Sequence, residues 1–193
     1  MPTKQRRGEE TRKRLLEAAL LTHERGEFTV QAVLAESGVS LGSLYHHFTN
    51  FDGLAASSYA KCMAELLDHL VAELARTRTA RRGVEAVVRA YLSFVVDQSS
   101  KARFIHASAY ATYLPAYKEL IAETKKVRMA RMAEWLAPHV AAGTVIPLPD
   151  PLTEMLLIGP VAELSRRWLT DPTIDLEKAA GLLPARIWAA LAA

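Results

Sequence analysis

The sequence predicts an all-α fold, and three features of its patterning lead to that class. Apolar residues recur every three or four positions along most of the chain, which is the spacing of amphipathic helices. Residues that favour helix N-caps, and glycines that end helices, stand at the borders of these stretches. No stretch shows sustained alternation of apolar and polar residues, and no repeat of about 20 to 50 residues recurs.

Three short helices are expected at the start of the chain. The first covers residues 11–25 and carries an apolar stripe at i, i+1, i+4 and i+5. Thr29 caps a second helix over residues 30–37, and Ser40 caps a third over residues 41–48.

The middle of the chain predicts four further helices. A long fourth helix over residues 50–75 carries one continuous apolar stripe of about five turns. A fifth follows an arginine-rich connector and includes Val84 to Val95, and a short sixth covers residues 104–111. Pro115 suits the first turn of a seventh helix, which Gly143 ends.

The last part of the chain predicts a loop and two helices. Residues 144–149 contain two prolines and little apolar pattern, which indicates an extended loop. Asp150 before Pro151 is expected to cap an eighth helix that runs to about Thr170, and Asp175 to open a ninth. The total is about nine helices.

Composition excludes several classes of protein. Half of the 193 residues are hydrophobic, enough for a core, which argues against a disordered chain. Cys62 has no cysteine partner, and neither a secretory signal nor an apolar run of about 18 residues is present. We therefore expect a cytoplasmic protein without disulfides or a membrane span.

The net charge of +3 is too small to indicate nucleic-acid binding, but its distribution is uneven. Six basic residues fall within the first 14, against two acidic ones, Glu9 and Glu10. A flexible, solvated tail over residues 1–10 is the simplest interpretation. An arm that contacts DNA phosphates or the minor groove is the other.

The segment from residue 29 to residue 48 has the features of a helix-turn-helix. Gly38 permits a left-handed turn and Val39 fills the angle between the two helices. Leu44 and Phe48 are expected to face inward, so the outward face of the second helix, which could enter a major groove, consists of Leu41, Gly42, Ser43, Tyr45, His46 and His47. A helical hairpin in an ordinary core is the alternative.

These residues also resemble a known family. Thr-Val at 29–30, Ser-Gly-Val-Ser at 37–40 and Gly-Ser-Leu-Tyr-His-His-Phe at 42–48 resemble the amino-terminal DNA-binding domain of TetR-family transcriptional regulators, over about residues 11–54. The resemblance implies a helix-turn-helix DNA-binding domain over residues 11–50. Its expected DNA-binding residues are Thr29, Ser40, Leu41, Gly42, Ser43, Tyr45 and His46.

The chain departs from the family pattern at two places. Thr22 and His23 stand where the family usually has an apolar and aromatic pair, so the first helix is expected to pack differently. Phe51 stands where a lysine that touches phosphate is common, so that contact is absent. DNA affinity would then depend more on Tyr45, His46 and the basic tail.

The resemblance further implies an effector-binding and dimerisation domain over residues 51–193. A largely apolar or aromatic effector pocket among helices four to seven would be lined by Met63, Tyr91, His106, Tyr110 and Trp135. For each of these residues, a place in an ordinary core is the alternative. The last two helices are apolar on more than one face, which suggests a homodimeric four-helix interface or an intramolecular core, with candidates Met155, Leu156, Trp168, Leu183 and Ile187.

No metal site, cofactor or catalytic motif is expected. The six histidines are scattered, and the sequence has no phosphate loop, nucleophile elbow or dinucleotide fingerprint. The predicted function is a homodimeric repressor that a small molecule releases from a palindromic operator. A constitutive repressor or architectural DNA-binding protein is the first alternative, and a helical enzyme or adaptor that has lost DNA binding is the second.

Overall fold

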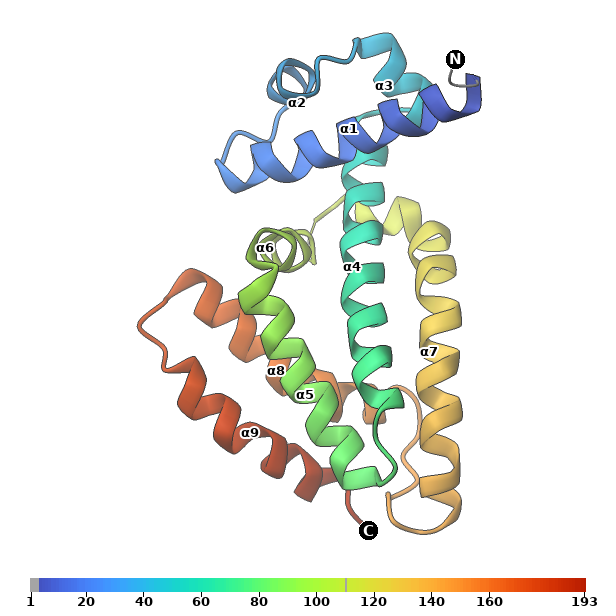
Figure 1. The fold of residues 1–193 in the computed structure, drawn as a ribbon, viewed down its shortest axis with the longest axis vertical. Helices are drawn as coiled ribbons and strands as arrows, with labels where there is room; N and C mark the ends of the chain where they lie inside the picture. The colour runs from blue at the N-terminus through green and yellow to red at the C-terminus, as the bar shows by residue number, and fades with distance from the viewer. Residues whose placement is uncertain (1–3, 110) are drawn as a thin grey trace. The chain divides into compact units, whose positions relative to one another are not determined.

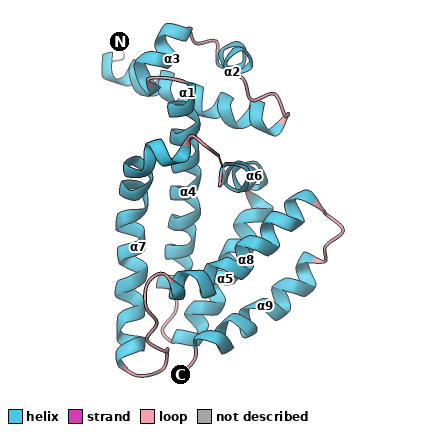
Figure 2. Cartoon of the chain, turned by 180° about the vertical axis from the view of Figure 1, so that it is seen from behind, coloured by secondary structure: helices cyan, strands magenta, loops and turns pink. Residues whose placement is uncertain are grey.

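The computed structural model describes residues 4–109 and 111–193, and within them it contains nine α-helices and no strand (Figures 1 and 2). An isolated antiparallel bridge joins Val145 to Ala192. The helices, with one 3-10 turn, are α1 (Lys4–Glu24), α2 (Val30–Ser37), α3 (Leu41–Phe48), α4 (Phe51–Ala75), α5 (Ala80–Asp97), α6 (Ser99–Ser108), η1 (Leu114–Tyr117), α7 (Lys118–Ala141), α8 (Leu152–Thr170) and α9 (Leu176–Leu191). The all-α prediction is confirmed.

Two expected starts differ from the structure because charged and polar residues extend the helices beyond their apolar stripes. Helix α1 begins at Lys4, so the expected flexible tail is wrong for residues 4–10, while residues 1–3 lie outside the described residues. Helix α6 begins at Ser99 and has ended by the expected last residue, Ala111.

The sequence also predicted the wrong start for two helices, α7 and α8, that follow a proline. Pro115 belongs to the 3-10 turn η1, and α7 begins after it at Lys118. Asp150 does not cap α8, because Pro151 is the N-cap residue and the cap has no side-chain hydrogen bond. Asp175 does cap α9, where its carboxylate accepts from the Lys178 amide at 2.8 Å.

The helices form two compact units, described here as unit 1 and unit 2. Unit 1 comprises residues 1–63 and 100–124, and unit 2 comprises residues 64–99 and 125–193. Helices α4 and α7 each contribute residues to both units. Packing therefore groups the chain differently from the expected functional division at residue 50, which remains a prediction.

The core of unit 1 forms where α1 packs on α2 and α3. Leu15, Ala19, Val33 and Leu44 are fully buried there, and Phe48 is 5% exposed. Their spacing along each helix places one apolar face of α1, α2 and α3 on a shared centre. This core fixes the backbone of α3 from one side only.

In unit 2, α5 packs against both α8 and α9. Val87, Val88 and Val95 of α5, Val161 of α8 and Leu191 of α9 are all at most 1% exposed. Figure 2 shows these three helices side by side. The buried faces of α8 and α9 are thus occupied within the chain.

Candidate functional site

The helix-turn-helix is built by its caps and its buried residues. The Thr29 hydroxyl accepts from the Ala32 amide at 3.2 Å, and the Ser40 hydroxyl accepts from the Ser43 amide at 3.3 Å. Gly38 has a φ of 61°, the left-handed conformation that glycine adopts without steric cost. Val39 is buried in the turn. The predicted turn geometry is therefore present.

Helix α3 turns one face into the core and leaves the other open. Leu44 and Phe48 face inward, whereas Leu41 is 43% exposed and Tyr45 is 47% exposed. At Gly42 a Cβ atom would have no neighbour within 4 Å, so the surface there is open. Of the predicted outward face of α3, Leu41, Gly42, Tyr45 and His46 are exposed, whereas Ser43 and His47 are half-buried.

Basic residues of α1 lie close to this face. The N-terminal part of α1 approaches α3, as a Cβ on Gly8 would lie 3.7 Å from the His47 ring (Figure 1). Arg6 and Arg7 are exposed, and the Arg12 guanidinium lies 5.3 Å from the centre of the Phe48 ring. Burial, then the nearby His46 and Arg12 charges, lower the pKa of His47. The first turns of α1 therefore add positive charge beside α3.

Phe51, interpreted from the sequence as a lost phosphate contact, has a structural role in unit 1. Its ring lies 4.8 Å from that of Phe28, which in turn meets the fully buried Phe104 of α6 at 5.6 Å between centroids. His23 joins the same aromatic cluster at 4.7 Å from Phe104, and burial lowers its pKa. His23 and Phe51, the two departures from the expected pattern, therefore both pack against Phe28.

The structure distributes the expected ligand residues over both units. Met63 and His106 belong to unit 1 and are half-buried, while Tyr91 is buried in unit 2. Tyr110 lies outside the described residues. Their roles as ligand contacts remain predictions.

Trp135 has a structural role in unit 2. Its indole N–H donates to the Thr77 carbonyl at 3.4 Å. A Cβ on Gly83 would lie 2.0 Å from the Trp135 ring, so the ring covers the backbone of α5 where only glycine fits. Trp135 therefore packs α7 against the start of α5.

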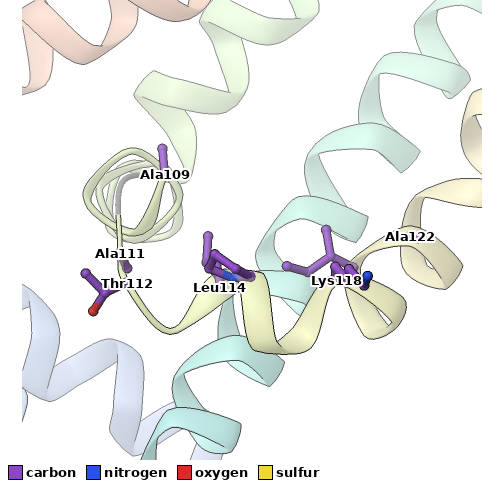
Figure 3. A pocket seen from close by; sticks show the side chains of 8 residues that line it. Ala109, Ala111, Thr112, Leu114, Lys118 and Ala122 are labelled. Carbon is purple, nitrogen blue, oxygen red and sulfur yellow. The ribbon is translucent and has the colours of Figure 1, made fainter.

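A pocket of about 580 Å³ lies at the end of α6, around η1 and at the start of α7 (Figure 3). This volume is within the usual range for small-molecule sites. Its wall is mostly apolar, with one hydroxyl and one ammonium group, and consists of Ala109, Ala111, Thr112, Leu114, Pro115, Lys118, Ile121 and Ala122. None of the described residues predicted for the ligand lines it, because small residues such as alanine carry no sequence signal for a cavity.

The candidate dimer residues differ in exposure. Met155 is 58% exposed, and Leu156, Trp168 and Leu183 are half-buried. Ile187 is 3% exposed within the chain, which favours the intramolecular alternative for this residue. The dimer assignments remain predictions. Leu182 of α9, which was not among the candidates, is also 58% exposed.

Two searches of the described residues concern other kinds of site. No helix among them is long and apolar enough to cross a membrane. Within the same residues, no group of three or more His, Cys, Asp or Glu side chains is placed to hold a metal ion.

Comparison with solved structures identifies the fold. A TetR family transcription regulator from Marinobacter aquaeolei VT8 superposes with a TM-score of 0.78 at 18% identity, over 97% of this chain and 98% of that one. The transcriptional regulator FadR from Bacillus subtilis, in complex with stearoyl-CoA, gives 0.75 at 17%, over 91% and 96%. A putative TetR-family regulator from Rhodococcus sp. gives 0.69 at 26%, over 93% and 97%. No family model and no curated protein sequence matches the chain.

Proposed function

We propose that this chain, which has the fold of the TetR-family transcription regulators, is a homodimeric, sequence-specific DNA-binding repressor that a small molecule releases from its operator. The observation that carries the proposal is the open face of α3. Leu41, Gly42 and Tyr45 stand exposed on a short helix that two caps and a buried core hold in place. A rigid, exposed helix of this kind fits a major groove about 12 Å wide.

The residues of α3 divide into two roles. Leu41 and Ser43, at the start of the helix, face base edges, where apolar and hydroxyl groups read sequence. Tyr45 and His46 reach the sugar-phosphate backbone, as do the exposed arginines of α1. Thr29 and Ser40 act mainly by capping α2 and α3. The backbone amides in the first turns of these two helices face phosphates.

The pocket beside η1 supports the ligand half of the proposal. Its apolar wall with Lys118 and Thr112 suits a small molecule that is largely apolar and carries one polar group. FadR from Bacillus subtilis, a regulator of the same fold, binds a small molecule in its complex with stearoyl-CoA. Met63, Tyr91, His106, Tyr110 and Trp135 remain further candidates for contact.

The test of DNA binding compares the wild-type protein with Tyr45→Phe on a selected operator and on an unrelated duplex. Loss of one hydroxyl contact to phosphate should weaken both complexes by the same factor, about three- to tenfold, since a hydrogen bond is worth roughly 0.5–1.5 kcal/mol. Fluorescence anisotropy at fixed salt measures both constants. Unequal losses would assign Tyr45 to base readout instead, and a wild-type protein that binds no duplex at low salt would exclude the proposed function.

A further inference from the structure

The two-residue connection between α3 and α4, Thr49 and Asn50, contains a strained turn centred on Thr49. Thr49 has a φ of 68° and a ψ of −44°, and the Asn50 amide donates to the Phe48 carbonyl at 2.8 Å. This is the γ-turn geometry that is rare for any residue, and a β-branched side chain makes positive φ more costly. Such strain persists only where surrounding contacts hold the backbone.

Asn50 supplies two of these contacts. Its side-chain oxygen accepts from the Gly53 amide at 2.7 Å, which caps α4. The same oxygen accepts from the Tyr117 hydroxyl at 2.9 Å. The side chain of Asn50 thus connects the start of α4 with η1 within unit 1. Asn50 and Tyr117 are 67 residues apart in sequence.

Gly53 shows how closely α4 meets α3. A Cβ at Gly53 would lie 1.9 Å from the Phe48 carbonyl oxygen and 3.3 Å from the Tyr117 hydroxyl. The first turn of α4 therefore abuts the last residue of the helix whose open face carries the proposed DNA contacts. Because there is no free space between the start of α4 and the end of α3, a movement of the first would displace the second.

Tyr117 lies in the same short turn as two residues of the pocket wall, although it does not line the pocket itself. It is the last residue of η1, and Leu114 and Pro115 of the same four-residue turn line the pocket. Its neighbour Tyr113 makes a comparable hydrogen bond, but to Ser108 at 3.1 Å, within the α6 and η1 region. Burial, together with the charge of Asp52 in the first turn of α4, raises the pKa of Tyr113, so this residue also lies near α4. Of the two tyrosines, Tyr117 is the one whose hydroxyl bonds to Asn50 in the α3–α4 turn.

We propose that Tyr117 is a positioning residue for α3: its hydroxyl fixes Asn50, and through Asn50 the strained turn that sets the end of the DNA-reading helix. The position of η1 therefore affects the position of the end of α3. The expected effect on DNA binding rests on the proposed function, whereas the expected effect on the turn can be measured without DNA.

The first experiment compares Tyr117→Phe with Tyr113→Phe in the full chain. Each change removes one hydroxyl and keeps the ring. Tyr117→Phe should weaken binding to the operator selected by the wild-type protein about three- to tenfold and leave binding to an unrelated duplex unchanged, because phosphate contacts remain. Tyr113→Phe should match the wild-type protein in both. Equal effects of the two changes, or none, would overturn the assignment of Tyr117.

A double-mutant cycle tests the link to Asn50. Asn50→Ala removes the acceptor, so adding Tyr117→Phe to it should weaken operator binding no further. Fully additive losses would show that Tyr117 acts elsewhere and would contradict the proposal.

Hydrogen exchange of residues 44–54 in the DNA-free protein separates this proposal from the proposed function. Exchange should be faster in Tyr117→Phe than in the wild-type protein and unchanged in Tyr113→Phe, at equal melting temperatures. If the wild-type protein selects no duplex, the proposed function fails and exchange alone decides the role of Tyr117. Identical exchange in all three proteins would overturn it.

Discussion

Gly42 occupies the open face of α3, where a Cβ would meet no atom within 4 Å. Its φ is not in the left-handed region, so alanine is sterically allowed within the chain. A glycine inside a helix costs roughly 0.5–1 kcal/mol relative to alanine. The chain thus carries a residue that its own packing does not require, which is the pattern expected where another molecule approaches the backbone.

Gly42→Ala should therefore raise stability and weaken function. The melting temperature should rise by about 2–4 °C per kcal/mol for a chain of this size. Operator affinity should fall at least about tenfold, because the added methyl group meets DNA. Calorimetry and anisotropy measure the two effects. An alanine variant that binds the operator as tightly as the wild-type protein would show that DNA does not approach α3 at this residue.

Trp135 and Ile187 show why residue type is a weak predictor of a site. Both are large and apolar; Trp135 was assigned to the effector pocket and Ile187 to the dimer interface. In the structure the Trp135 ring covers Gly83, and Ile187 lies in the core shared by α5, α8 and α9. The sequence places such residues on a helix face but does not show what covers that face.

Among the elements, α2, α3 and α9 were predicted closely because each begins with a side-chain cap. Thr29, Ser40 and Asp175 all make the expected hydrogen bonds to the first turn. The starts of α1 and α6 were missed since charged residues extend them without apolar spacing. A capping residue can be recognised from the residues next to it in the sequence. The packing that stabilises a polar helix end involves distant parts of the chain, so the local sequence does not reveal it.

Helix α8 retains exposed apolar surface after its packing against α5 and α9. Met155 is 58% exposed, and Gly159 faces open space. With Leu182 of α9, also 58% exposed, this surface is the candidate for a twofold interface in the proposed homodimer.

Met155→Asp should dissociate the dimer, because a charge would be buried in the interface. Val127→Asp on α7 is the matched control, since Val127 is also 58% exposed and lies outside α8 and α9. Sedimentation should show a dissociation constant raised at least about tenfold for Met155→Asp and unchanged for Val127→Asp. A Met155→Asp protein that remains dimeric at the wild-type concentration would place the interface elsewhere.

At the scale of the whole molecule, the sequence predicted the helix-turn-helix but not its support. Phe104 joins the aromatic cluster of Phe28 and His23, and Tyr117 bonds to Asn50, so unit 1 includes residues 100–124. These contacts join segments more than 50 residues apart, which local spacing cannot reveal. The pocket was missed for a different reason: its wall is local and consists largely of a turn and of alanines, residue types that do not indicate a cavity in the sequence.

The central claim is that α3 reads DNA sequence, and operator selection tests it most directly. Wild-type protein and Leu41→Ala would each be incubated with the same pool of random duplexes, and the bound fractions sequenced. Wild-type protein should enrich a palindrome whose half-site centres are about 34–36 Å apart or a multiple of that, and Leu41→Ala should enrich a palindrome altered at the same position in each half. A pool that shows no enrichment with wild-type protein, or the same sequence with both proteins, would contradict the account.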